Sequence, residues 1–452
     1  MREATQKTTL ENGIRVLSEH MDGVRSVSVG VLVDVGPKDE QPAECGYAHL
    51  LEHMLFQGTG ERDAKAIAEM MEIGGGAIGA FTARDYTVYH ATMLDEYLPF
   101  ALEVLGDMLC NSVLPEEALE RQIGVIVNEI AGNDDPISSA NDLLKATLWP
   151  NHPMGNPTAG LEETLQQASR DDLLEFMRQH YIASKLILAA AGNVDHENFV
   201  AQTRDSFWQM NGLHSPSHPP SSPEPHLGAV IAQPRDRQQV YFALAWPAPA
   251  YTSPQRYAWH VFSSLYGGGP TSRLYRRLRE EQGMVYHIDA QYQAYGTTGA
   301  LVVEGATLPQ TLVPVLAGTL IELWQMGEGE INLDEYHRAT QSLISQHLVS
   351  GDSAYVRMSR LALQEQYFRQ TVPSDEVIAG LSGLRSEEVQ QVALEIFSAG
   401  LPTIALVGPV SDKLLSDVET MLSDFGEPSS VTFTDENGQS AFPVGAVILS
   451  AD

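Results

Sequence analysis

His49-Leu50-Leu51-Glu52-His53 places two histidines and a glutamate within one turn of a predicted helix. On a helix, positions four apart lie on one face about one turn apart, so two imidazoles at that spacing can hold one ion between them. The Glu52 carboxylate projects beside them and can reach a water on that ion. The alternative is a helix that carries two histidines and a carboxylate by coincidence, and the context of the motif has to decide.

The composition limits the class of protein. A chain of 452 residues should form more than one domain, and 43% hydrophobic residues are enough for packed cores. The formal net charge of −32, from 59 acidic residues against 27 Lys and Arg, argues against a nucleic-acid partner or an anionic membrane surface. Solubility explains the acidity, and attraction of basic peptides is a second explanation that overall charge does not separate from the first.

Cysteine usage and the start of the chain bear on its compartment. Cys45 and Cys110 are the two cysteines, too few for a disulfide framework. Residues 1–7 lack the apolar run of a signal peptide, and no later stretch is long and apolar enough to span a bilayer. We therefore expect a soluble, cytoplasmic protein that does not bind a membrane.

The first half, residues 1–212, reads as a catalytic domain of mixed strands and helices. Asn12-Gly13 lies between two short apolar runs and favours a tight hairpin turn. Residues 24–35 alternate apolar and polar positions as a strand does, and a polar loop then leads to the His49–His53 helix. The order of elements predicts an α+β fold, with helices covering a mostly antiparallel sheet.

A Pro- and Ser-rich segment, residues 213–226, separates the two halves and is expected to be an extended linker. The second half, residues 227–452, repeats the outline of the first: an apolar strand at 239–246 is followed by a loop and a helix. We therefore expect a second, homologous domain.

A weak alignment of the two halves places Ser263 and Ser264 where Glu52 and His53 stand. The second domain is accordingly expected to share the fold and to have no metal site.

A catalytic zinc takes three protein ligands and leaves a fourth position for water. His49 and His53 supply two, and the third should come from another helix packed against theirs. Glu129, on a helix expected over residues 115–130, is the candidate. Spacing and composition alone do not select it over three other acids of that helix, Glu116, Glu117 and Glu120.

Residues 49–59 (HLLEHMLFQGT) closely resemble the signature of the M16, or pitrilysin, family of zinc metallopeptidases. The half-length bacterial members, similar to the beta subunit of the mitochondrial processing peptidase, fit the chain best. The resemblance implies the LuxS/MPP-like metallohydrolase fold and one Zn²⁺ per chain, held by His49, His53 and Glu129 (129 − 53 = 76). It also implies that Glu52 is the general base on a zinc-bound water.

The family often has a second Glu seven residues before the third ligand, where it helps to order that ligand. The residue here is Gln122 (129 − 7 = 122). Gln can form hydrogen bonds but carries no charge, so the resemblance does not carry a charged supporting group to this position.

Two further stretches resemble the family's substrate-binding features. Residues 279–286 (REEQGMVY) match a stretch whose Arg and Tyr bind substrate carbonyls and the developing oxyanion, which assigns those catalytic roles to Arg279 and Tyr286. A helix-to-strand junction with a surface Arg and a core Tyr is the structural alternative. A second stretch resembles the edge strand that pairs with substrate backbone, with Gly in place of the usual Asn; its residues here are Gly79, Ala80, Phe81 and Thr82.

The function implied is a zinc-dependent endopeptidase that hydrolyses oligopeptides or unfolded segments inside an enclosed chamber. Full-length relatives enclose that chamber with four such domains, whereas this chain has two. We therefore expect a homodimer, or pairing with an unlike M16 partner. The alternative, from another class, is a non-catalytic scaffold or partner-binding subunit of a heteromeric peptidase or other complex.

Overall fold

The computed structural model describes residues 5–73, 77–131, 136–210, 221–329, 331–426 and 430–433. The chain divides into two compact units, each built around one six-stranded sheet. The described residues of the first unit fall within 1–132, 156–220 and 347–374, and those of the second within 133–155, 221–346 and 375–452. Within the described residues, no helix has the length and apolar character needed to cross a membrane.

The sheet of the first unit has the strand order β1-β2-β6-β3-β5-β4, in which every neighbouring pair is antiparallel except β2 and β6. The expected hairpin joins β1 to β2, and Gly13 takes the positive φ of 98° that its turn requires. The strands are β1 (Thr5–Thr9), β2 (Arg15–His20), β3 (Ser26–Val33), β4 (Ala77–Thr82), β5 (Thr87–Leu94) and β6 (Leu186–Gly192).

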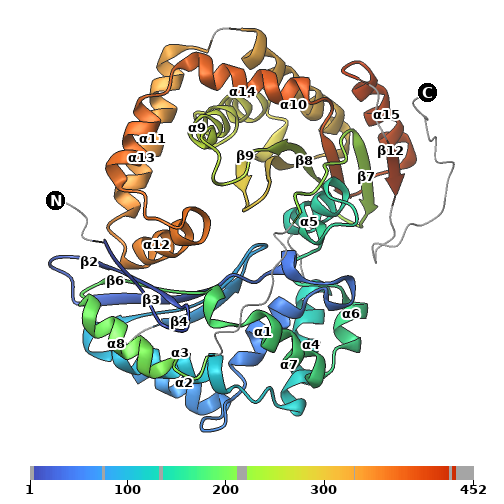
Figure 1. The fold of residues 1–452 in the computed structure, drawn as a ribbon. Helices are drawn as coiled ribbons and strands as arrows, with labels where there is room; N and C mark the ends of the chain where they lie inside the picture. Colours follow the sequence, from blue (N-terminus) through green and yellow to red (C-terminus); the bar gives the residue numbers. More distant parts are fainter. Residues whose placement is uncertain are drawn as a thin grey trace. The chain divides into compact units, whose positions relative to one another are not determined.

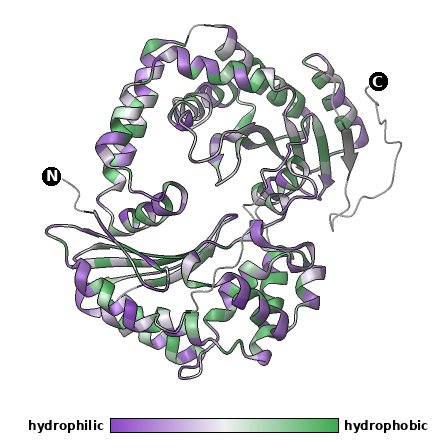
Figure 2. Cartoon of the chain, viewed as in Figure 1, coloured by the Kyte–Doolittle hydropathy of each residue, from purple (hydrophilic) through white to green (hydrophobic). Residues whose placement is uncertain are grey.

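Helices cover both faces of this sheet (Figure 1). The larger core lies between one face and α1, α3, α4, α7 and α8, while α12 packs on the other face. Hydrophobic and hydrophilic residues alternate along these helices, as expected for helices with one face against a sheet (Figure 2). The helices of the unit are α1 (Tyr47–Leu55), α2 (Ala64–Ile73), α3 (Leu98–Asn111), α4 (Glu116–Ala131), α6 (Glu162–Gln167), α7 (Arg170–His180), α8 (His196–Ser206) and α12 (Ala354–Phe368).

The sheet of the second unit has the order β12-β7-β11-β8-β10-β9 and repeats the pairing pattern of the first. The outermost strand differs: β12 pairs with β7 in parallel, whereas β1 and β2 form an antiparallel hairpin. The strands are β7 (Ala229–Pro234), β8 (Val240–Ala248), β9 (Val285–Ala294), β10 (Gly299–Thr307), β11 (Thr403–Gly408) and β12 (Ser430–Phe433). The fold class expected from the sequence is confirmed.

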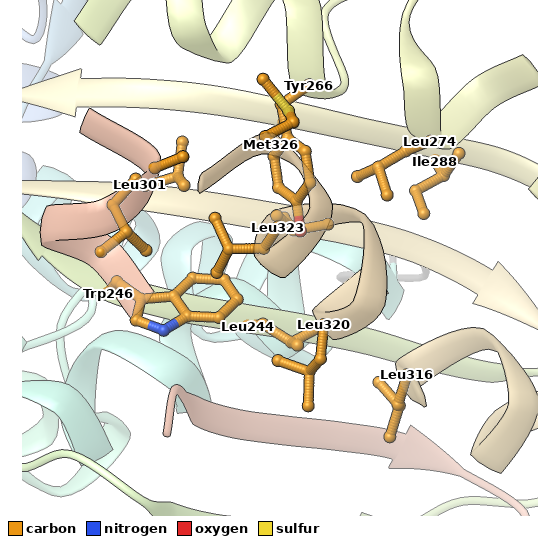
Figure 3. Packing of buried hydrophobic residues seen from close by; sticks show 14 of the residues in the cluster. Leu244, Trp246, Tyr266, Leu274, Ile288, Leu301, Leu316, Leu320, Leu323 and Met326 are labelled. Atoms are coloured by element: carbon orange, nitrogen blue, oxygen red, sulfur yellow. The ribbon is translucent and has the colours of Figure 1, made fainter. Parts of the chain in front are cut away.

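The core of the second unit joins strand residues to the helix α10 (Figure 3). Trp246 of β8 and Leu301 of β10 are fully buried near Leu323 of that helix (Figure 3). The helices of the unit are α5 (Pro136–Leu148), α9 (Arg256–Tyr266), α10 (Leu312–Glu328), α11 (Leu333–Ser350), α13 (Ser374–Ser382), α14 (Ser386–Ser398) and α15 (Asp412–Ser423). Residues 347–350, at the end of α11, fall in the segment assigned to the first unit.

Two helices do not follow the expected domain boundaries, 1–212 and 227–452. Helix α5, from the first half of the sequence, packs on the sheet of the second unit, and α12, from the second half, packs on the sheet of the first. The second sheet accepts α5 because its facing side chains are small, which lets the helix approach closely; they include Ala243, Ala245, Ala300 and Ala405. Of the expected linker, residues 213–220 lie outside the described residues, and 221–226 form no helix or strand.

Helix α9 occupies, in the second unit, the place of α1 in the first, because each follows the corresponding central strand, β8 or β3. Ser263 and Ser264 lie on α9, in agreement with the alignment of the halves. Among the described residues, the one group of His, Cys, Asp and Glu side chains that could hold a metal ion is in the first unit.

Candidate metal centre

Helix α1 is fixed at its first turn. Gly46 precedes it with a φ of 99°, and a Cβ added there would lie 2.8 Å from the Cα of Gly160. The buried carboxylate of Glu40 accepts hydrogen bonds from the backbone N–H groups of Gly46 (2.9 Å) and Ala48 (2.8 Å). Burial raises the pKa of Glu40 to about 7, although both hydrogen bonds favour the carboxylate.

His49, His53 and Glu129 come together in the first unit. Each offers one ligand atom, and these three atoms lie within 4.8 Å of one another. The two imidazoles are one helical turn apart on α1, with ring centroids separated by 4.7 Å. Helix α4 packs against α1 and brings Glu129, while Ile126, one turn earlier, is fully buried in the core. Two imidazoles and a carboxylate are a donor set suited to a catalytic zinc.

Gln122 supports one of these ligands. Its Oε1 lies 3.1 Å from Nδ1 of His53. A carbonyl oxygen only accepts, so Nδ1 carries the proton in this arrangement and Nε2 keeps the free lone pair that a metal needs. Gln122 therefore orders the second histidine of the motif without the charge that the family often has at this position.

His49 is prepared for a cation in a different way. Burial, with a smaller effect of the neighbouring His53, lowers the pKa of His49 to about 4, so its imidazole is neutral at pH 7. Its Nδ1 is buried and has no hydrogen-bond partner among the described residues. A neutral imidazole with a ring nitrogen that forms no hydrogen bond to the protein is suited to act as a metal ligand.

Glu52 lies close enough to His53 and Glu129 for their charges to act on it, and it is 8% exposed. Burial raises the pKa of its carboxyl group, and the hydrogen bond from Thr82 opposes that effect. The hydroxyl of Thr82 donates to Oε2 of Glu52 at 2.6 Å. Such a carboxyl, beside the ligands but outside their cluster, can act as an acid or a base.

The expected edge strand is at the edge of its sheet. β4 pairs with β5 on one side and is the last strand of the order. Gly79 makes room for a histidine of β5, because a Cβ there would lie 3.0 Å from Nε2 of His90. Phe81 is 37% exposed, and Ala80 packs against the core on the opposite side of the strand. The substrate-pairing role of residues 79–82 stays a prediction.

Arg279 and Tyr286 lie together in the second unit. Arg279 belongs to a π-helical segment, Tyr275–Glu281, and its guanidinium lies 5.0 Å from the centroid of the Tyr286 ring. Tyr286, at the start of β9, is 76% exposed and so is not the core residue of the structural alternative. Their catalytic roles stay a prediction.

Sequence reasoning missed three features of the centre. Glu40 is an acid in the loop before the motif helix, and no pattern marks it. The seven-residue spacing drew attention to Gln122 but did not show that its partner is His53. Thr82 was expected to act through its backbone, and nothing local indicates that its hydroxyl reaches an α1 carboxylate.

Comparisons with known proteins identify the family of the chain. Residues 15–162 match the family profile described as "Insulinase (Peptidase family M16)", and residues 167–343 match that of the "Peptidase M16 inactive domain". The chain is 32% identical over 418 residues to an uncharacterized zinc protease of Streptomyces coelicolor, which covers 91% of each chain. It is 30% identical over 410 residues to the uncharacterized zinc protease YmxG of Bacillus subtilis, covering 89% of this chain and 98% of the other.

Two solved structures share the fold. A protease from Helicobacter pylori superposes with a TM-score of 0.84 at 19% identity, covering 90% of this chain and 99% of that one. A peptidase M16 inactive domain protein from Pseudomonas fluorescens gives a TM-score of 0.81 at 18% identity, with the same coverage. The chain belongs to peptidase family M16.

Proposed function

We propose that the protein is a zinc-dependent endopeptidase that cleaves oligopeptides or unfolded segments, with Glu52 as the general base. The observation that carries the proposal is the cluster of His49, His53 and Glu129 ligand atoms within 4.8 Å, with the buried carboxyl of Glu52 beside it. The relatives carry the name uncharacterized zinc protease, which supports the same activity.

A zinc ion at this cluster would polarise a scissile carbonyl and lower the pKa of a coordinated water to about 7. The protein's own groups do the rest. His49 presents a neutral imidazole, Gln122 orients His53 by a hydrogen bond, and Glu129 adds a carboxylate to the cluster. Glu52 accepts a proton from the attacking water and returns it to the leaving amine.

Peptide cleavage and metal content, measured on the parent and on Glu52→Gln, test the proposal. The variant should keep its zinc and lose cleavage by roughly a hundredfold to ten-thousandfold, the contribution expected of a general base. Glu120→Gln is the matched control, because Glu120 is an exposed acid on α4 outside the cluster. This variant should cleave peptides as the parent does. A parent that binds no zinc and cleaves no peptide would instead favour the scaffold alternative.

The proposal extends to a homodimer in which Arg279 and Tyr286 of one copy complete the site of the other around an enclosed chamber. What supports it is the family resemblance, together with the exposure of Tyr286 beside Arg279. Glu52→Gln and Tyr286→Phe, each inactive alone, can be mixed after subunit dissociation. Half of the dimers are then mixed and carry one intact site of two, so about a quarter of parental activity should return. No recovery despite verified subunit exchange would contradict this arrangement.

A further inference from the structure

The hydroxyl group of Thr82 donates a hydrogen bond to the proposed general base, Glu52. Thr82 ends β4 and Glu52 lies on α1, 30 residues apart in sequence, yet their Oγ1 and Oε2 atoms are 2.6 Å apart. β4 and α1 pack against each other, which holds the two groups together. A hydroxyl-to-carboxylate hydrogen bond of this length belongs to the short, charge-assisted kind, about twice as strong as one between neutral groups.

The proton of Thr82 has one good acceptor. Its Oγ1 also lies 3.4 Å from Oγ1 of Thr87, but the Thr87 hydroxyl donates to the carbonyl oxygen of Val35 at 3.0 Å. A threonine hydroxyl has a single proton to give. The nearer and charged acceptor is Glu52, so the hydroxyl of Thr82 points at that carboxylate.

The strand places this hydroxyl on the side of α1. Successive side chains of a strand face opposite sides, and Ile78 and Ala80 pack against the core that contains α1. Thr82 continues that series. Gly79 and Phe81 belong to the other side, where both lie near His90 of β5. A one-residue change of register would therefore turn the hydroxyl away from Glu52.

The bond has a consequence for catalysis, because the terminal torsion of a glutamate is broad and leaves a free carboxylate able to rotate. With Oε2 held by Thr82, the plane of the Glu52 carboxylate is set. Oε1 accepts no hydrogen bond among the described residues. It is the oxygen left to take a proton from a water at the candidate metal cluster.

We propose that Thr82 is a positioning residue for Glu52: its hydroxyl anchors one carboxylate oxygen and leaves the other for proton transfer. The inference rests on the proposed function for its catalytic meaning, whereas the hydrogen bond itself is a contact of the structure. β4 is also an edge strand, so a peptide that pairs with it would contact the same strand that carries Thr82.

Thr82→Ser and Thr82→Ala are the matched pair for the test, since both lack the γ-methyl group and they differ only in the hydroxyl. Thr82→Ala should lower kcat about tenfold to a hundredfold, the range that misplaced catalytic groups show, with KM within about twofold of the parent. Thr82→Ser should recover most of the loss. Thr82→Val, which keeps the branched shape that suits a strand, should behave as Thr82→Ala. Zinc affinity by chelator competition should be the same in all four proteins.

A second readout needs no activity. In metal-free protein, a double-mutant cycle of Thr82→Ala and Glu52→Ala, measured by urea unfolding, should show a coupling of about tenfold in the unfolding equilibrium constant. Parental kcat in Thr82→Ala, with Glu52→Gln inactive, would overturn the inference while the proposed function stands. Absence of coupling between the two substitutions would overturn it as well. If the zinc-loaded parent cleaves nothing, the proposed function fails instead, and the cycle still tests the bond.

Discussion

Replacing Gln122 by Ala should weaken zinc binding without removing a ligand. The side chain is half-buried, and its Oε1 lies 3.1 Å from Nδ1 of His53. A neutral hydrogen bond of this kind contributes about 1 kcal/mol, or about fivefold in affinity. Its loss also frees the imidazole to rotate and to change tautomer. Outer partners of metal-bound histidines typically contribute ten- to hundredfold in affinity, so we expect the zinc dissociation constant to rise by about that factor.

Competition with a chromogenic chelator, at fixed pH and ionic strength, measures that constant. Gln122→Glu is the informative companion, because a carboxylate partner makes the imidazole a better donor and should tighten binding beyond the parent. Glu120, an exposed residue of the same helix, provides the control, and Glu120→Ala should bind zinc as the parent does. Equal dissociation constants for the parent, Gln122→Ala and Gln122→Glu would refute the assignment of Gln122 as the partner of His53.

Three further predictions follow from other contacts. Glu129→Gln should weaken zinc binding more than Gln122→Ala in the same assay, since it alters a ligand itself. Between pH 4.5 and about 7 the folded protein keeps the proton on Glu40 that an unfolded glutamate releases. Rising pH should therefore lower the free energy of unfolding of the parent by roughly 3 kcal/mol over this window. In urea unfolding, Glu40→Gln should not show this decrease with pH. Glu365→Gln should destabilise the protein by about 3 to 5 kcal/mol, because it leaves the buried Arg15 without its carboxylate partner. Lys7→Ala, at the exposed side of the same cluster, should cost about 1 kcal/mol or less. A loss below about 1 kcal/mol for Glu365→Gln in urea unfolding would contradict the first value.

Much of the fold could be predicted because short stretches of sequence indicate the individual strands, turns and helices. Asn12-Gly13 marked the first hairpin, and the alternation over residues 24–35 marked the central strand of the first sheet. The repeat of strand, loop and helix predicted the second sheet, whose pairing pattern matches the first. These signals are short-range, and each states the type of an element.

The assignment of α5 and α12 could not be predicted in the same way. An apolar helix face shows that a helix is buried, but it does not say against which sheet. Leu144 and Leu148 of α5 would suit any apolar surface, and their burial against small side chains of β8, β10 and β11 is seen in the folded structure alone. On the first sheet, Met358 of α12 packs over Gly30, a close contact that no periodicity indicates.

The residues of the candidate metal centre also differ in whether short-range sequence patterns could predict them. His49, Glu52 and His53 could be found because three groups on one helical turn are a local pattern. Glu129 required the family resemblance, since periodicity left other acids of α4 equally eligible. Gln122 accepts a hydrogen bond from His53, 69 positions away, and Thr82 donates one to Glu52, 30 positions away. Both bonds depend on how α1 packs against α4 and β4.

The central claim is that His49, His53 and Glu129 hold one zinc ion. X-ray absorption at the zinc edge, on purified protein of known metal content, tests it most directly. We predict one zinc per chain, with two imidazole nitrogens at about 2.0 to 2.1 Å and oxygen ligands at about 2.0 to 2.2 Å. Sulfur at about 2.3 Å, or a protein that retains no zinc after dialysis, would contradict the claim.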